Sequence, residues 1–374
     1  MTTDKYQLKT RQICLFIIAF LPITKLFMMP SIATKFANED MWISVFINLL
    51  LDFTTIFILT ITCRNFSANF FEILENTFGK IGSKIILCLY FFVFFIKAIL
   101  PLEEQRDYIE YTLYTLMPTI MYFLPFFILA FYLCTKKLRV IGRISDVMWI
   151  ITIIGFTILI VLSFGNADFA ALLPFGANGL SGITKGAYKT FLWFGDSIYF
   201  IFFIGNYKYS KGDYKKIFLA FLTHTFMVLL FSIIFYTIFT SIAFRQRFAL
   251  TEISKYTTVI NNIGRFDFLG IMMILLSNLF ALSFPLYFCC LILNRIFEFK
   301  QKWISPTITV GLHLSFMFFF AQYYATIESL LLGYGSLIFF VFGNLLPLIL
   351  PLLYKKSFKN KSYNKSKEYL NETN

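Results

Sequence analysis

The chain has 374 residues, of which 58% are hydrophobic, 20% are aromatic and only 14% are charged. This apolar content exceeds the roughly 45–50% of a typical soluble domain, so the composition indicates an integral membrane protein. The formal net charge of +13 would suit a nucleic-acid-binding protein, but the positive residues concentrate in the connections between apolar segments, as in membrane proteins, so we expect no nucleic-acid partner.

Ten segments are apolar enough to cross a membrane as helices, which takes about 20 residues each. With the N-terminus in the cytoplasm, the connections richest in Lys and Arg face inward, among them Thr135 to Arg143 with four positive charges and no acid. We therefore predict an all-α membrane protein with both termini cytoplasmic, a transmembrane permease domain over residues 1–354 and a basic, disordered cytoplasmic tail over 355–374. The predicted spans cover residues 12–34, 41–63, 83–103, 117–134, 147–165, 188–206, 217–243, 267–293, 304–325 and 331–353.

The first span is interrupted by the sequence FLPITKLFMMP, from Phe20 to Pro30. Pro22 cannot donate a helical hydrogen bond and frees a carbonyl one turn back. Lys25 follows within a turn, and Thr24 adds a hydroxyl beside the interruption. Because broken backbone at membrane depth persists only where it is buried or lines a cavity, we predict a solute site at this break.

The second and third spans each carry one charge at depth, Asp52 and Lys97. A charge at the centre of a span costs about 2.5–3.5 kcal/mol, so these two side chains need a role. An ion pair between them and a part in ion coupling are both open. Between the two spans, Phe70, Leu74 and Phe78 recur at helical spacing and predict a short interfacial helix.

An acidic cluster follows the third span, made of Glu103, Glu104 and Asp107 with Arg106 among them. We expect these side chains to form a solvated helix end, because charged residues at the end of a span are usually in water.

The sixth span has a second interruption at Gly195 and Asp196, with Tyr199 one turn further on. Asp196 could accept a substrate ammonium, pair with Lys25 or carry a proton. Lys25 could hold a substrate carboxylate or stand in place of a coupling cation. The alternative without a ligand is that Lys25 extends to the membrane surface and Asp196 caps a helix end.

The two breaks fall in the first members of two successive sets of five spans. Because five is odd, the second set runs through the membrane in the opposite sense, which predicts inverted repeats over about 12–165 and 188–353 with discontinuous first helices. The six cysteines and two histidines lack metal-site spacing, and the sequence has no nucleotide-binding or hydrolase motif, so we expect no metal, no cofactor and no enzyme activity.

The chain resembles the spore germination permeases, the GerAB-type B subunits of germinant receptors, which belong to the amino acid–polyamine–organocation superfamily. The resemblance rests on three stretches: LPITKLFMMPSIATKFANEDMWIS from Leu21, VIGRISDVMWII from Val140 and LLPFGANGLSGITKGAYKTFLWFGDS from Leu172. The chain departs from the family pattern at the first break, where it has Pro22, Ile23 and Lys25 in place of a glycine and small hydroxyl residues.

This resemblance implies a LeuT-like fold of ten spans and a site for an amino acid or similar small germinant at the broken helices. It also implies assembly with an A-type and a C-type receptor subunit in the spore inner membrane. A stand-alone amino acid transporter driven by protons or sodium is the alternative that the residues leave open.

Overall fold

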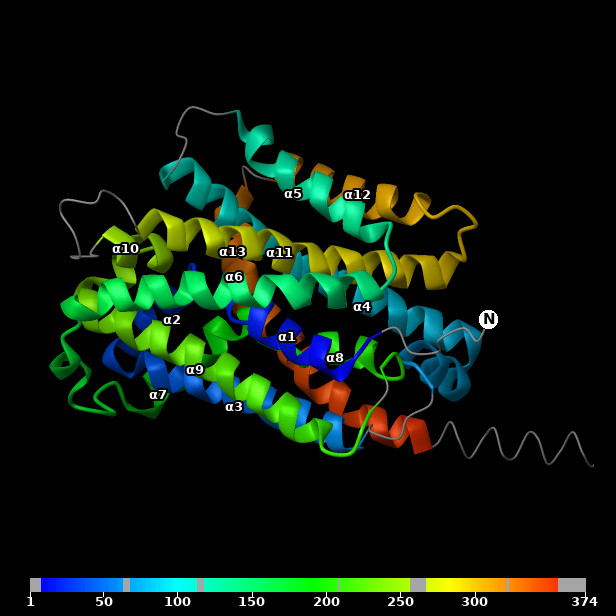
Figure 1. The fold of residues 1–374 in the computed structure, drawn as a ribbon, viewed down its shortest axis with the longest axis horizontal. Coiled ribbons are helices and arrows are strands. Elements are labelled where there is room, and N and C mark those ends of the chain that lie inside the picture. The colour runs from blue at the N-terminus through cyan, green and yellow to red at the C-terminus, as the bar shows by residue number, and fades with distance from the viewer. Residues whose placement is uncertain are drawn as a thin grey trace, which may run out of the picture.

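The computed structural model describes residues 8–62, 68–112, 118–207, 209–255, 267–320 and 323–355, and over these residues it is helical with no regular strand. Long helices lie side by side along one common direction (Figure 1). Six segments are long and apolar enough to cross a membrane: Met29–Thr62, Phe70–Glu110, Arg139–Asn166, Asp213–Arg245, Leu269–Phe297 and Tyr324–Lys355. The all-helical membrane class is therefore confirmed.

The first and sixth predicted spans are each built from two short helices. The first contains α1 (Thr10–Phe20) and α2 (Met29–Ala37), and the sixth contains α7 (Gly179–Thr190) and α8 (Ser197–Phe203). The chain is not helical throughout either span, as the interruptions at Pro22 and Gly195 predict.

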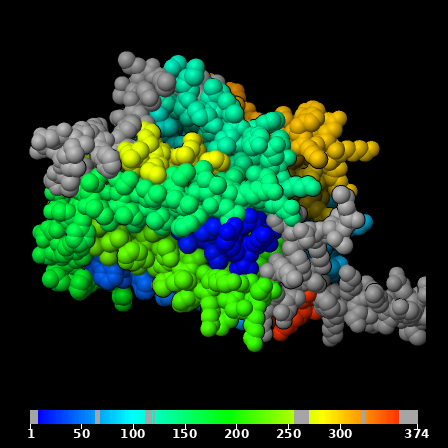
Figure 2. Space-filling view, in the orientation of Figure 1, coloured from blue at the N-terminus to red at the C-terminus, as the bar shows by residue number. Residues whose placement is uncertain are grey.

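Longer helices pack around these broken pairs. They are α3 (Met41–Thr62), α4 (Phe70–Thr112), α5 (Thr119–Cys134), α6 (Arg139–Ser163), α9 (Asp213–Phe239), α11 (Asp267–Phe297) and α12 (Ile304–Phe320). The short α1 lies against α6 and α9, which flank it on the surface in Figure 2. On the other side α11 packs against α4, α5 and α6, and it also contacts α1 and the turn Ile23–Lys25 of the first broken pair.

The last span is irregular near its middle. It runs from α13 (Tyr324–Leu330) through a π-helical turn at Leu331–Gly335, α14 (Ser336–Phe340) and a second π-helical turn at Val341–Leu345. Single π-turns widen a helix locally and often occur beside functional sites. The second of these turns lies against α3 and α8.

Two connections carry helices of their own. Gly79 has a φ of 72°, which separates residues 70–78 from the rest of α4. Phe70 and Leu74 are buried against the protein and Phe78 is exposed, as expected of a helix lying along the membrane surface. The connection after α9 contains α10 (Ala249–Lys255). The predicted disordered tail lies outside the described residues from residue 356 onward.

Candidate functional site at the helix breaks

The first break places a lysine in the interior of the protein. α1 ends at Phe20, and Ile23–Lys25 form a single 3-10 turn before α2 begins at Met29. Lys25 is fully buried, and its ammonium donates to the carbonyl of Leu21 at 2.8 Å and to Asp196 Oδ2 at 2.6 Å. Lys25 therefore does not extend to the membrane surface, and it pairs with Asp196, which was one of the expected arrangements.

The second break depends on a glycine. After the 3-10 turn Phe191–Trp193, Phe194 is extended and Gly195 has a φ of +74°. A Cβ at Gly195 would lie 3.2 Å from the carbonyl oxygen of Phe339 and 3.4 Å from Gly343 Cα. Only glycine combines this conformation with so close an approach to the last span. The chain turns here and starts α8 with Asp196 on the boundary.

Asp52 caps the N-terminal end of α8. Its two carboxylate oxygens accept from the backbone amide of Gly195 at 3.0 Å each, and Oδ2 also accepts from the amide of Asp196 at 3.2 Å. The first amides of a helix have no partner within the helix, and a negative charge there also interacts well with the helix dipole. Asp52, on α3, therefore caps α8. The side chain of Asp196 makes no capping bond, so the alternative in which Asp196 caps this helix is not the arrangement seen.

Lys97 has the corresponding role at the carbonyl end before the break. Its ammonium donates to the carbonyl of Phe194 at 2.6 Å and lies 3.9 Å from Asp196 Oδ1. Among the described residues, the ion-pair partner of Lys97 is Asp196. Of the two roles left open for Asp52 and Lys97, the direct ion pair between them is therefore not formed. Asp52 instead accepts from the amide of Gly195, and Lys97 donates to the carbonyl of Phe194, on either side of the same break.

Glu104 links the two breaks on their other side. Its carboxylate accepts from Trp193 Nε1 at 2.9 Å and from the amide of Met28 at 3.4 Å. The prediction that Glu103, Glu104 and Asp107 form a solvated helix end was wrong, since all three are at most 4% exposed. Sequence position alone placed them at a membrane boundary. In the structure Glu104 contacts Met28 and Trp193, and Asp107 pairs with Arg106 and Arg247.

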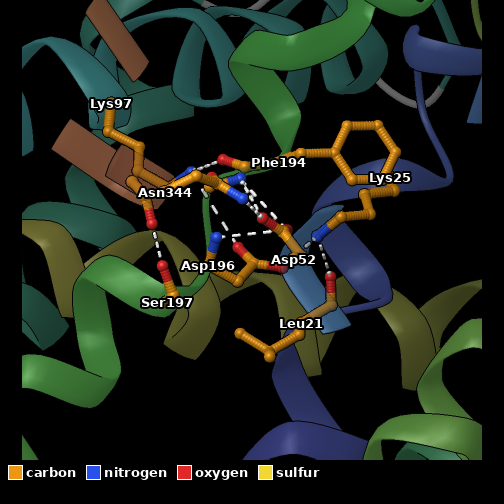
Figure 3. A network of polar contacts seen from close by, with 10 residues as sticks. Leu21, Lys25, Asp52, Lys97, Phe194, Asp196, Ser197 and Asn344 are labelled. Atoms are coloured by element: carbon orange, nitrogen blue, oxygen red, sulfur yellow. Dashed lines mark hydrogen bonds and ion pairs between the residues drawn. The ribbon is translucent and has the colours of Figure 1, made fainter. Parts of the chain in front are cut away.

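The two breaks thus share one electrostatic arrangement, most of which appears in Figure 3. At the carbonyl ends, ammonium groups of Lys25 and Lys97 satisfy the free backbone oxygens. At the amide ends, carboxylates of Asp52 and Glu104 accept from free backbone nitrogens. Asp196 lies between the two ammonium groups. The chain therefore fills both breaks with its own charges, in the way a bound ion or zwitterion would.

A small cavity adjoins this cluster. It has a volume of about 30 Å³ and is lined by Thr24, Lys97, Asp196 and Tyr199 together with aromatic side chains, including Phe16 and Phe284. This volume holds about two water molecules, since one needs roughly 10–15 Å³. Pro22 does not line it; its carbonyl accepts from the amide of Lys25 at 3.0 Å and so shapes the turn.

Two further residues of the site, Asn344 and Ser197, were not predicted as site residues from the sequence. Asn344 in the last span donates from Nδ2 to Asp52 and Thr55 at 3.2 Å each. Ser197 donates to the carbonyl of Gly343, which lies in the second π-helical turn. The only local signal in the sequence was a Gly-Asn pair in an otherwise apolar span.

Paired interrupted helices that enclose buried charges within an apolar bundle define a membrane permease rather than an enzyme. The sequence model of the family described as "Spore germination protein" matches residues 7–329. The chain therefore belongs to the spore germination permease family, as the sequence resemblance indicated.

No curated protein matches the chain. Among the solved structures that resemble it are two mutants of the manganese transporter of Eremococcus coleocola. One is 10% identical with a TM-score of 0.44, and the other is 11% identical with a TM-score of 0.43. Each comparison covers 89% of this chain and 78% of the transporter.

Proposed function

We propose that this chain is the permease-like B subunit of a spore germinant receptor and binds an amino acid or similar small germinant at the two helix breaks. The observation that carries the proposal is the position of Asp196 between Lys25 and Lys97, next to free backbone ends of both breaks. An amino acid carries one ammonium and one carboxylate, and this cluster offers a partner for each.

The ligand ammonium would take the place of Lys25 on Asp196 and on the Leu21 carbonyl, and the ligand carboxylate would bind the displaced Lys25 or Lys97. Thr24 and Tyr199 line the adjoining cavity and would contact the rest of the ligand. Because the cavity holds only about two waters, binding has to separate the Lys25–Asp196 pair and move the half-helices. A ligand that binds one arrangement better than the other shifts the population between them, which is what a receptor requires.

Family membership supports the remaining parts of the proposal. They are ten spans in a LeuT-like five-plus-five inverted repeat, cytoplasmic termini, the spore inner membrane as location, and A- and C-type subunits as partners. The paired interruptions of α1–α2 and α7–α8 fit the inverted repeat, since each pair begins one predicted set of five.

The test is titration of the purified chain with each of the common amino acids, followed by thermal unfolding in detergent. We expect at least one to stabilise the wild-type protein, and Lys25→Met and Asp196→Asn each to abolish that stabilisation. Lys185→Met, which removes an exposed charge on α7, serves as the matched control and should respond as wild type. Unchanged affinity in both site variants would remove these residues from the binding site.

The alternative is a stand-alone amino acid transporter driven by protons or sodium. The observation that favours it is the carboxylate of Asp196, an ionisable group on the wall of the central cavity. Uptake of the stabilising amino acid by the chain alone in proteoliposomes, with and without an ion gradient, separates the two functions. Concentrative uptake would favour the transporter.

A further inference from the structure

A basic cleft lies at the end of the molecule where α5 ends and α6 and α12 begin. It has a volume of about 580 Å³, and eight residues line it: Thr135, Lys136, Lys137, Arg139, Val140, Arg143, Lys302 and Trp303. Five of these are cationic and none is acidic. The proposed germinant site contains none of them, so the cleft is a separate feature.

Four of the five cationic side chains of this cleft form no ion pair with the residues that the structure describes. Across the described part of the chain, Lys136, Lys137, Arg143 and Lys302 have no ion-pair partner within 4 Å. The first residues of α6, Arg139 and Val140, also contribute to the wall, and the amide ends of helices attract anions. A cleft with this charge and this shape is suited to a compact, multiply hydrogen-bonding anion such as a phosphate group.

The surface next to the cleft is suited to an acyl chain. Exposed apolar side chains recur along one face of α5, at Met121, Leu124, Ile128 and Tyr132, at helical spacing. This face leads directly into the cleft, because the ammonium of Lys136 lies 4.4 Å from the centre of the Tyr132 ring. α5 is at an outer edge of the bundle, beside α12 (Figure 1).

The depth of the cleft in the membrane follows from Trp303. This side chain is 56% exposed and directly precedes α12, and exposed tryptophans at the ends of spans lie at the level of the lipid headgroups. The charges and the apolar face therefore meet at headgroup depth, where a phosphodiester and its acyl chains are found together. Basic pockets between spans on the cytoplasmic side, where we expect this end to lie, are typical sites for anionic lipid headgroups.

We propose that this cleft binds the phosphate headgroup of an anionic phospholipid, with an acyl chain along the exposed face of α5. Lys136, Lys137, Arg143 and Lys302 bind the phosphate, and Trp303 and Tyr132 lie beside the glycerol region. The proposal does not depend on the germinant site.

The test uses Trp303 as the reporter. The full-length chain is placed in phosphatidylcholine vesicles that contain increasing amounts of phosphatidylglycerol brominated on its acyl chain, since bromine quenches a nearby tryptophan. The same series with brominated phosphatidylcholine is the reference, and Trp303→Phe provides the signal of the other tryptophans. We expect phosphatidylglycerol to quench Trp303 at a clearly lower mole fraction than phosphatidylcholine does.

Variants that remove charges test whether the lipid preference comes from the cleft. Lys136→Gln/Lys137→Gln/Lys302→Gln should reduce the preference for phosphatidylglycerol by about tenfold or more, and the same three positions changed to Arg should retain it. The matched control is Lys80→Gln/Lys84→Gln/Lys215→Gln, which removes three exposed charges that do not line the cleft. This control should keep the wild-type preference within about twofold, because distant surface charges are screened by salt.

Three results would overturn the proposal. Equal quenching by the two lipids would show that the cleft does not select an anionic headgroup. If the cleft variant and the control variant lost the preference for phosphatidylglycerol equally, the preference would come from the overall positive charge of the protein surface and not from the cleft. Abolition of the preference by inorganic phosphate, but not by sodium chloride of the same ionic strength, would assign the cleft to a free phosphate instead of a lipid.

Discussion

Breaking the ion pair between Lys25 and Asp196 should be among the most destabilising single changes in this protein. Its nitrogen and oxygen are 2.6 Å apart, and the two side chains are 0% and 3% exposed. Removing one partner of a buried pair leaves the other charge without compensation, which costs about 3–5 kcal/mol. The two single variants should fall at different ends of this range.

The difference follows from Lys97. In Lys25→Met, Asp196 keeps a second ammonium at 3.9 Å, so we expect a cost near ~3 kcal/mol. In Asp196→Asn, both ammonium groups lose their shared carboxylate, so we expect a cost near ~5 kcal/mol. The double variant leaves only Lys97 unpaired, and its cost should therefore be smaller than the sum of the two by about 2–3 kcal/mol.

The measurement is a double-mutant cycle from equilibrium unfolding of the detergent-solubilised chain. The matched control is the pair of Arg295 and Glu75, which has the same 2.6 Å separation but is 43% and 34% exposed. Arg295→Met and Glu75→Gln should show a coupling below about 1 kcal/mol, as is usual for exposed pairs. Costs for Lys25→Met and Asp196→Asn that add to within ~0.5 kcal/mol would refute the reasoning.

Three further predictions concern the break and the tail. Asp52→Asn should destabilise the protein by about 1.5–3 kcal/mol in the same unfolding assay, because a charged acceptor of backbone amides at the start of α8 is lost; a neutral effect would contradict the capping role. Gly343→Ala should cost ~1–3 kcal/mol because its Cβ would lie 2.6 Å from Gly195 Cα, whereas Gly311→Ala, with no atom within 4 Å, should cost nothing. Truncation after Tyr354 should leave amino acid affinity unaltered in the titration, and a large loss would show that the tail contributes to the site.

The interruptions themselves could be predicted from the sequence because their causes are local. Pro22 removes a hydrogen bond from its own helix, and Gly195 supplies a conformation that other residues avoid. The charged residues at the breaks could be identified from the sequence, but the groups that each of them contacts could not. Asp52 lies 143 residues from the glycine amide that it accepts from, and no periodicity relates two spans so far apart.

Residues in apolar surroundings were the hardest to place. Asn344 donates to an oxygen of Asp52, which is 292 residues away in the sequence, and apart from the Gly343-Asn344 pair its span has only an apolar pattern. The acidic cluster was misplaced for a related reason. Hydropathy locates the end of a span but does not say whether another helix covers it, and Glu104 is covered by both broken helices.

The formal charges around Asp196 also predict which solutes this site selects. Lys25 and Lys97 carry two positive charges, and Asp52 and Asp196 carry two negative charges, so the charges immediately around Asp196 are formally balanced in a buried setting. Glu104 is not counted here because it contacts Met28 and Trp193 rather than these four residues. A zwitterion leaves that balance unchanged when it enters. An amine without a carboxylate, or a carboxylate without an amine, would leave one buried charge unpaired at a cost of about 3–5 kcal/mol.

We therefore expect an amino acid that stabilises the chain to bind at least about a hundredfold more tightly than its decarboxylated or deaminated counterpart, since 1.4 kcal/mol corresponds to a factor of ten. Competition of each analogue with the amino acid in the thermal unfolding titration measures the ratio. Lys97→Met gives the site a net negative charge and should move the preference toward the amine. If both analogues bound as tightly as the amino acid, the ligand would not contact this charge cluster at all.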